Sequence, residues 1–389
     1  MKFLYSLVAF YKWIILPALA FLMFLIFRDA FLFYSQSKFK QKIEWDVFEI
    51  KIPREIEKGP KAMEQFFAGL WSLWNVPTSW VDKYLEGEVT YWYSFELVGS
   101  GGRVHFYVRV PKKFRHSIES MLYAQYPDIE ISDVEDYVSE VPTSFDKLEK
   151  LGYELFGSEL RLAQPAPNPI NTYVVFEEKG GEERIIDPFS VMLELLSRLR
   201  PEERFWIQFV LRPADPKWQK EGEKVMKEIK EKTLIKPPSA AKAQQPSYPF
   251  AILTPAEEEK LKVISRKVSK QGFETLIRYL YIAPKDIFDK NFSKNLGVYF
   301  NQYSFLNYFV PNFAALTRVQ WYKWPFFFPK RREKERKRKI LYKYKIRYLP
   351  EETASGRINY FSIWSMEYWT KKSSISILNT EEIATLYHL

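Results

Sequence analysis

The sequence of 389 residues predicts an α+β protein that is tethered by an N-terminal membrane-spanning helix. Three observations predict this class. An apolar run extends from Phe3 to Phe27. The stretch Glu44–Val134 alternates between strand-like and helix-like apolar periods, and strand and helix patterns recur after Lys150. A chain of this length has room for two or three domains with ample core.

Residues 1–40 are predicted to form the membrane anchor. A bilayer core requires roughly 20 residues of helix, so the run Phe3–Phe27 is long enough, and Lys12 and Arg28 could extend their ammonium and guanidinium groups toward the two interfaces. The alternative is a cleaved signal peptide with its cleavage site at Ala18-Leu19-Ala20, although the apolar run continues past this site.

The basic residues around the apolar run predict its orientation. Lys2 and Lys12 lie on its N-terminal side, whereas Arg28, Lys38, Lys40 and Lys42 lie on its C-terminal side. The side with more Lys and Arg normally stays in the cytoplasm. We therefore expect a single-pass protein of the cell membrane whose folded part is cytoplasmic.

Residues 41–135 are predicted to form a unit with the element order βαββαβ. Val47–Ile52 alternates as a strand, and the helix after Pro60 carries one apolar stripe. A hairpin follows, with strands on either side of Gly99-Ser100-Gly101-Gly102, and then comes a helix over Arg115–Ala124 and a strand around Ile129–Ile131. With right-handed crossovers this order is ferredoxin-like, with both helices on one face of the sheet.

Residues 136–329 are predicted to form a second α+β unit with a Pro-rich linker or loop at 236–249. The expected elements are strands over Leu155–Leu162, Thr172–Glu178, Phe205–Leu211 and Phe273–Ile282, a helix starting at Asp187-Pro188, a charged helix around Trp218–Ile229, and a helix over Glu257–Ser269. This order is compatible with a second ferredoxin-like unit whose middle is expanded, although the hairpin between its middle strands is missing or replaced. Phe288–Phe328 shows no clean period.

Residues 330–389 combine a basic segment with C-terminal strands and a short helix. The net charge is +10, and +6 of it lies within Lys330–Lys339. Its basic residues are Lys330, Arg331, Arg332, Lys334, Arg336, Lys337, Arg338 and Lys339. Three interpretations stay open for them: a solvated charged helix or loop, a contact with anionic lipid, or a contact with nucleic acid.

The C-terminal segment carries a helix start signal. Asn379 and Glu382 have the spacing of a capping box, and Ile383, Leu386 and Tyr387 supply an apolar stripe. An isolated helix of about two turns is marginal in water. We therefore expect the segment to dock on the folded part of the chain or on a partner, with a frayed end as the alternative.

No catalytic, cofactor or metal site is predicted, and the chain is expected not to be an enzyme. His105, His116 and His388 lack metal-ligand spacing, and the absence of Cys excludes disulfides and thiolate zinc sites. The glycine-rich stretch 99–102 joins two strands and is therefore a turn.

Several motifs resemble an uncharacterised, membrane-anchored family of unknown function from candidate-phyla bacteria. They are Phe48–Glu55, Lys58–Glu64, His105–Arg109, Pro111–Arg115, Ala124–Pro127 and Leu378–His388. In many members the region precedes a type IV secretion coupling-type ATPase domain. The resemblance implies an ATPase or another protein subunit as partner and assigns no active-site residues. This sequence contains no G-x-x-x-x-G-K-[ST] phosphate loop.

Two functions are therefore expected as alternatives. The first is a non-enzymatic component of a type IV secretion or related DNA-translocation apparatus that positions a partner ATPase at the membrane. The second is a membrane-tethered nucleic-acid-binding module that uses the basic segment and an outward sheet face with Trp92, Arg103, Tyr107 and Arg109. An open sheet face would favour nucleic acid, and a covered face would favour assembly.

Overall fold

A computed structural model describes residues 2–53, 58–180, 187–232, 253–289, 291–319, 328–350, 353 and 375–389. The predicted linker at 236–249 lies outside these residues. So do position 290 and positions 320–327 of the stretch for which no period was found, and much of the segment between the basic run and the C-terminal helix.

The described part of the chain forms an α+β fold around one antiparallel sheet. Eight strands follow the order β4-β1-β3-β2-β6-β7-β5-β8, and a ninth, β9, pairs with β7. The strands are β1 (Trp45–Lys51), β2 (Tyr93–Ser100), β3 (Arg103–Pro111), β4 (Glu130–Asp133), β5 (Tyr153–Leu162), β6 (Arg204–Pro213), β7 (Gly272–Pro284), β8 (Phe309–Pro311) and β9 (Ser376–Asn379).

The first half of the sheet contains the predicted βαββαβ element order. Helices α2 (Pro60–Trp71) and α3 (Arg115–Gln125) connect strands whose spatial order is β4-β1-β3-β2. Met63 and Leu70 of α2 and Ile118 and Leu122 of α3 belong to one hydrophobic core, so both helices lie on the same face, as expected. The description of this unit as ferredoxin-like stays a prediction.

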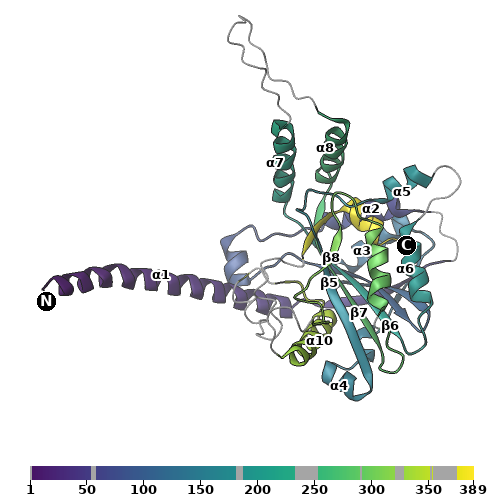
Figure 1. Cartoon of the computed structure of the whole chain (residues 1–389), viewed down its shortest axis with the longest axis horizontal. Coiled ribbons are helices and arrows are strands. Elements are labelled where there is room, and N and C mark those ends of the chain that lie inside the picture. The colour runs from purple at the N-terminus through teal and green to yellow at the C-terminus, as the bar shows by residue number, and fades with distance from the viewer. Residues whose placement is uncertain are drawn as a thin grey trace, which may run out of the picture.

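The second half repeats this strand order in the opposite direction across the sheet. Its strands lie in the order β6-β7-β5-β8, and antiparallel pairing of β2 with β6 joins the two halves. In chain order, helices α7 (Lys217–Lys232) and α8 (Pro255–Val268) lie between β6 and β7. They pack on each other and project from the sheet (Figure 1). In chain order, α9 (Phe292–Asn301) then leads to β8.

One sequence expectation for this half is corrected. The predicted strand Thr172–Glu178 is instead the helix α5 (Tyr173–Gly180). Residues three apart share a face of a helix, and there Tyr173 donates to Glu64 while Phe176 packs on Tyr303 with ring centroids 6.0 Å apart.

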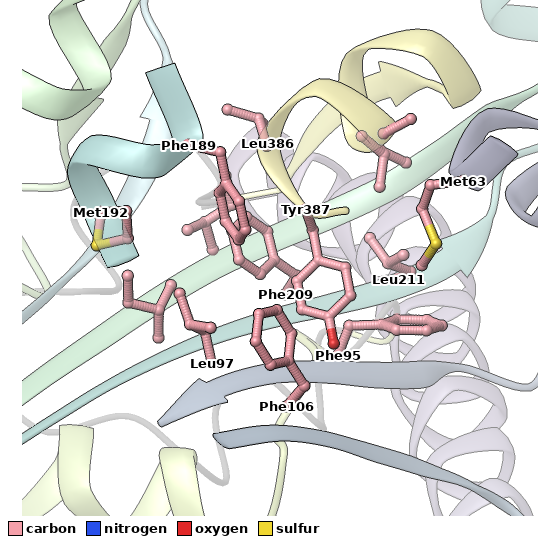
Figure 2. Packing of buried hydrophobic residues seen from close by; sticks show 14 of the residues in the cluster. Met63, Phe95, Leu97, Phe106, Phe189, Met192, Phe209, Leu211, Leu386 and Tyr387 are labelled. Atoms are coloured by element: carbon pink, nitrogen blue, oxygen red, sulfur yellow. The ribbon is translucent and has the colours of Figure 1, made fainter. Parts of the chain in front are cut away.

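An apolar core covers one face of the sheet. We call this side of the sheet the aromatic face. Helices α2, α3, α6 (Pro188–Ser197), α9 and α12 (Thr380–Leu386) contribute to it. The capping box of Asn379 and Glu382 is present, and α12 is buried throughout. Figure 2 shows Tyr387 among Phe95, Phe106 and Phe209, with ring centroids 5.5–5.9 Å from it. The C-terminal segment therefore docks on its own chain.

The other face, which we call the charged face, is covered by different elements. They are the short helix η3 (Tyr137–Glu140), α4 (Phe145–Lys150) and α10 (Pro329–Lys345). Ile340, Leu341 and Tyr344 of α10 pack there against Leu155, Trp206 and other side chains of the sheet. The basic run of the sequence is therefore the first part of a helix that packs on the sheet.

The N-terminal helix α1 (Lys2–Gln41) extends away from the sheet (Figure 1). Within it, Ile15–Gln41 is long and apolar enough to cross a membrane. At about 1.5 Å per residue the helix is roughly 60 Å long, about twice the thickness of a bilayer core. Its C-terminal part therefore reaches the sheet, where β1 begins at Trp45.

Candidate functional site: the charged face and the helix junction

A row of charged and polar side chains crosses four strands of the charged face. Glu96 lies opposite Gln208, Gln208 opposite Arg278, and Arg278 opposite Glu159 in the strand registers. Gln208 donates to Glu96 over 2.9 Å and accepts from Arg278 over 2.9 Å. Arg278 also donates to Glu159 over 2.8 Å. The row is continuous from β2 to β5, and its members are buried.

Arg347, just after α10, connects this row to the chain that covers it. Its guanidinium donates to both carboxylate oxygens of Glu96 over 2.9 Å and to both oxygens of Asp136. Tyr137 adds a 2.7 Å hydrogen bond to Glu96 and a 2.8 Å contact with the hydroxyl of Tyr344. The row thus holds η3 and the end of α10 on the sheet.

The surroundings of Glu96 favour its ionised carboxylate. Burial by itself raises the pKa of the Glu96 carboxyl, but the charge and hydrogen bonds of Arg347 hold that pKa below its usual range. Arg347 has a φ of +49°, in the left-handed region that follows many helices and that glycine usually occupies. An arginine there costs about 1–3 kcal/mol of backbone strain, which its paired guanidinium offsets.

The eight predicted basic contact residues point in several directions. Lys334 and Arg338 pair with Asp146 over 3.1 and 2.7 Å, and Lys337 pairs with Glu154 over 2.8 Å. Arg332 and Arg336 are buried, whereas Lys330 and Arg331 are exposed and Lys339 is half-buried. Many of these cations are therefore paired with carboxylates or buried within the chain, and the eight do not form one uniform basic surface.

The four predicted sheet-face residues are mostly covered. Tyr107 stacks on Tyr137 with ring centroids 4.7 Å apart. The ring centroids of Trp92 and Trp45 lie 4.9 Å apart, and the guanidinium of Arg109 lies 3.9 Å from the centre of the Trp45 ring. Burial lowers the pKa of Arg109 to about 10. Of the four, only Arg103 is classed as exposed, so they do not form an open stacking surface.

Sequence analysis did not single out Glu96, Arg278, Arg347 or their network. One signal was present, because Arg278 interrupts an apolar strand and Glu96 occupies an alternating position in another. The partner of Glu96 could not be found in this way, since Arg347 lies 251 positions further along the chain.

The three histidines stay apart in the structure. His105 contacts Glu49 over 2.5 Å, His116 lies 3.8 Å from Glu119, and His388 contacts Asp187 over 3.0 Å. Burial raises the pKa of the Asp187 carboxyl, but the hydrogen bond from His388 brings it below its usual value. Among the described residues, no group of three or more His, Cys, Asp or Glu side chains converges as a metal site would require.

The junction between α1 and the sheet domain is closely packed. The short helix η1 (Val81–Glu86) lies against the C-terminal part of α1, where Ser35 and Gln36 are buried (Figure 1). Gly87 ends η1 with a φ of +69°, and a Cβ there would lie 2.2 Å from the carbonyl carbon of Ser35. Only glycine allows this approach without strain. The junction therefore fixes α1 to the folded part.

Comparison with known proteins identifies a family. Residues 34–306 match the model of a family described as a domain of unknown function (DUF8128). The match begins in the last part of α1 and runs past the end of α9, while β8, α10, β9 and α12 follow it. A search of curated proteins finds no match.

Proposed function

The chain belongs to the DUF8128 family, and we propose that it is a membrane-anchored, non-enzymatic assembly component. One observation carries this proposal: the long apolar helix continues into a junction that is packed against the sheet domain. A rigid connection of this kind holds a folded domain at a set distance from a membrane. A flexible tether would not require the close contact of Gly87 with Ser35.

The folded part is proposed to lie in the cytoplasm, because more Lys and Arg residues flank the C-terminal side of the apolar run. In bacteria the full chain should stay with membranes during carbonate extraction. Protease added to spheroplasts should leave residues 45–389 intact. Digestion of this part would contradict the orientation, and a mature protein that begins after Ala20 would establish a cleaved signal peptide instead.

The finer proposal is a role in a type IV secretion or related DNA-translocation apparatus, where the chain positions a partner ATPase. It rests on the resemblance of the motifs between Phe48 and His388 to a family whose members often precede such an ATPase. Purification of the tagged chain from native membranes, followed by mass spectrometry, should recover an ATPase with a phosphate loop. Recovery of other membrane proteins without any ATPase would contradict this role.

The covered charged face favours assembly over nucleic-acid binding. Tyr107 stacks on Tyr137, and the end of α10 packs over Glu96, so the described part of this face offers bases no open aromatic platform. Labelled single-stranded DNA should therefore bind no more tightly than about 10⁻⁶ M at physiological salt, the range of non-specific contact. Nanomolar affinity that Tyr107→Ala abolishes would favour the nucleic-acid function instead.

A further inference from the structure

A cavity of about 940 Å³ lies at the junction between α1, η1 and the end of β3. Phe31, Tyr34 and Lys38 of α1 line it at helical spacing, so a single stripe of α1 forms one wall, and Lys42 follows directly after the end of the helix. Leu85 of η1 contributes to the lining as well. This junction is where the helix that could span the membrane meets the folded part.

The lining of the cavity changes character along α1. Toward the apolar segment it presents Phe31, Tyr34 and Leu85, each of which is more than a third exposed. Toward the sheet the first lysines, Lys38 and Lys42, appear beside the apolar Phe39 and Ile43. Tyrosine beside lysine, next to an apolar helix, is the composition found where a membrane meets water.

The charge of the cavity is positive. Four lysines and two glutamates line it: Lys38, Lys42, Lys112, Lys113, Glu44 and Glu86. Lys112 pairs with Glu44 over 3.4 Å, and the ammonium of Lys113 lies 3.8 Å from the centre of the Tyr91 ring. Within the described part of the chain, Lys38 and Lys42 make no ion pair, in contrast to Lys334, Lys337 and Arg338 of α10.

We propose that this cavity binds the headgroup of an anionic phospholipid, with Lys38 and Lys42 at its phosphate and the acyl chains along Phe31 and Tyr34. The inference rests on the proposed membrane anchor. A lipid is favoured over a free phosphate ion because apolar side chains continue the lining toward the segment that would lie in the bilayer. The bound lipid would fix the junction and therefore the height of the folded part above the membrane.

The test uses the full chain in detergent micelles. Fluorescent phosphatidylglycerol is titrated in, and phosphatidylcholine with the same acyl chains serves as the neutral comparison. The wild-type chain should prefer phosphatidylglycerol. Because each lysine near an anionic surface contributes about fivefold in affinity, K38Q/K42Q should weaken phosphatidylglycerol binding about 25-fold.

A matched control is available on α7. Lys220 and Lys224 are exposed and have the same spacing of four residues, so K220Q/K224Q removes the same charge far from the junction in sequence. This variant should bind as the wild type does. Equal loss in both double variants would show a non-specific effect of net charge and would overturn the proposal.

Two further outcomes would also overturn it. One is equal affinity for phosphatidylglycerol and phosphatidylcholine. The other is displacement of the lipid by millimolar inorganic phosphate, which would identify a free anion as the ligand. Carbonate extraction reports on the anchor alone, whereas headgroup preference in micelles reports on the cavity alone, so the two proposals can fail separately.

Discussion

The two faces of the sheet are stabilised in different ways. On the aromatic face, Phe95, Phe106 and Phe209 surround Tyr387, and five helices bury the apolar core. On the charged face, Glu96 and Arg278 lie in the same sheet but are neutralised by groups distant in sequence. Apolar burial is non-directional and tolerates small shifts, whereas a buried ion pair requires one geometry. The charged face therefore specifies which segment covers it.

The largest expected effect on either face is the loss of one buried partner. Arg347→Ala leaves Glu96 buried without its counter-charge and should cost about 3–5 kcal/mol in free energy of unfolding. Phe95→Ala on the aromatic face should cost about the same, because it leaves a cavity in the core. Denaturant unfolding of the full chain in micelles, followed by tryptophan fluorescence, measures both losses.

A double variant separates the loss of a counter-charge from the loss of packing. Glu96→Gln combined with Arg347→Met removes both charges and should recover much of the stability that Arg347→Ala loses. No polar substitution near Phe95 should compensate for its cavity. If the double variant is as unstable as Arg347→Ala, the ion pair does not explain the stability of the charged face.

The pH dependence of unfolding should distinguish Glu96 from Glu382. The folded-state pKa of Glu96 is lowered, so the stability it contributes is present above about pH 4.3, the unfolded value, and is lost as the pH falls through the folded pKa. Burial raises the pKa of Glu382, which Lys267 at 3.0 Å only partly offsets. Its contribution is therefore largest below about pH 4.3 and falls as the pH rises from there.

Two variants test these opposite signs. Glu96→Gln should weaken the dependence of unfolding on pH below about 4.3, and Glu382→Gln should weaken it above about 4.3. Thermal unfolding between acidic and neutral pH provides the measurement. The same change of slope in both variants would show that the two buried carboxyls do not differ in the way their surroundings indicate.

The smallest effect is expected at the edge of the charged face. Hydrogen bonds from Arg338 and Lys334 lower the pKa of the Asp146 carboxyl to about 2, but this group is exposed to solvent. Exposed ion pairs contribute little and are screened by salt. Asp146→Asn should therefore lower the midpoint of thermal unfolding slightly at low salt and leave it unchanged at high salt. A large decrease of the unfolding midpoint at high salt would show that the ion pairs of Asp146 stabilise the fold as the buried pairs do.

Sequence analysis predicted the aromatic face better than the charged face, for a physical reason. The stripe of α2 and the capping box at Asn379 are local patterns, and local patterns determine helices and strands. The pairing of Arg347 with Glu96 depends on tertiary structure alone. The helical form of Tyr173–Gly180 was missed for the same reason, because its contacts with Glu64 and Tyr303 lie far away in the sequence.

The basic residues of α10 also show that the sequence alone does not reveal partners in the tertiary structure. Eight cations in ten positions indicate an exposed basic helix or loop, or a contact with lipid or nucleic acid, when they are considered alone. Asp146 of α4 and Glu154 of β5 neutralise several of them in the structure. By contrast, Lys38 and Lys42 served in the sequence only to predict the orientation of the apolar helix, and the fold places them together at a cavity.

The central claim is that α10 is part of the folded core and closes the charged face. Hydrogen exchange of the full chain in micelles tests this most directly, with residues 336–344 of α10 compared with residues 205–211 of β6. The account predicts that both segments open with the same free energy, because Gln208 of β6 donates to the carbonyl oxygen of Tyr344 and to Glu96, the partner of Arg347. Exchange in α10 that is orders of magnitude faster, while β6 stays protected, would show a detachable helix over an accessible charged face and would contradict the claim.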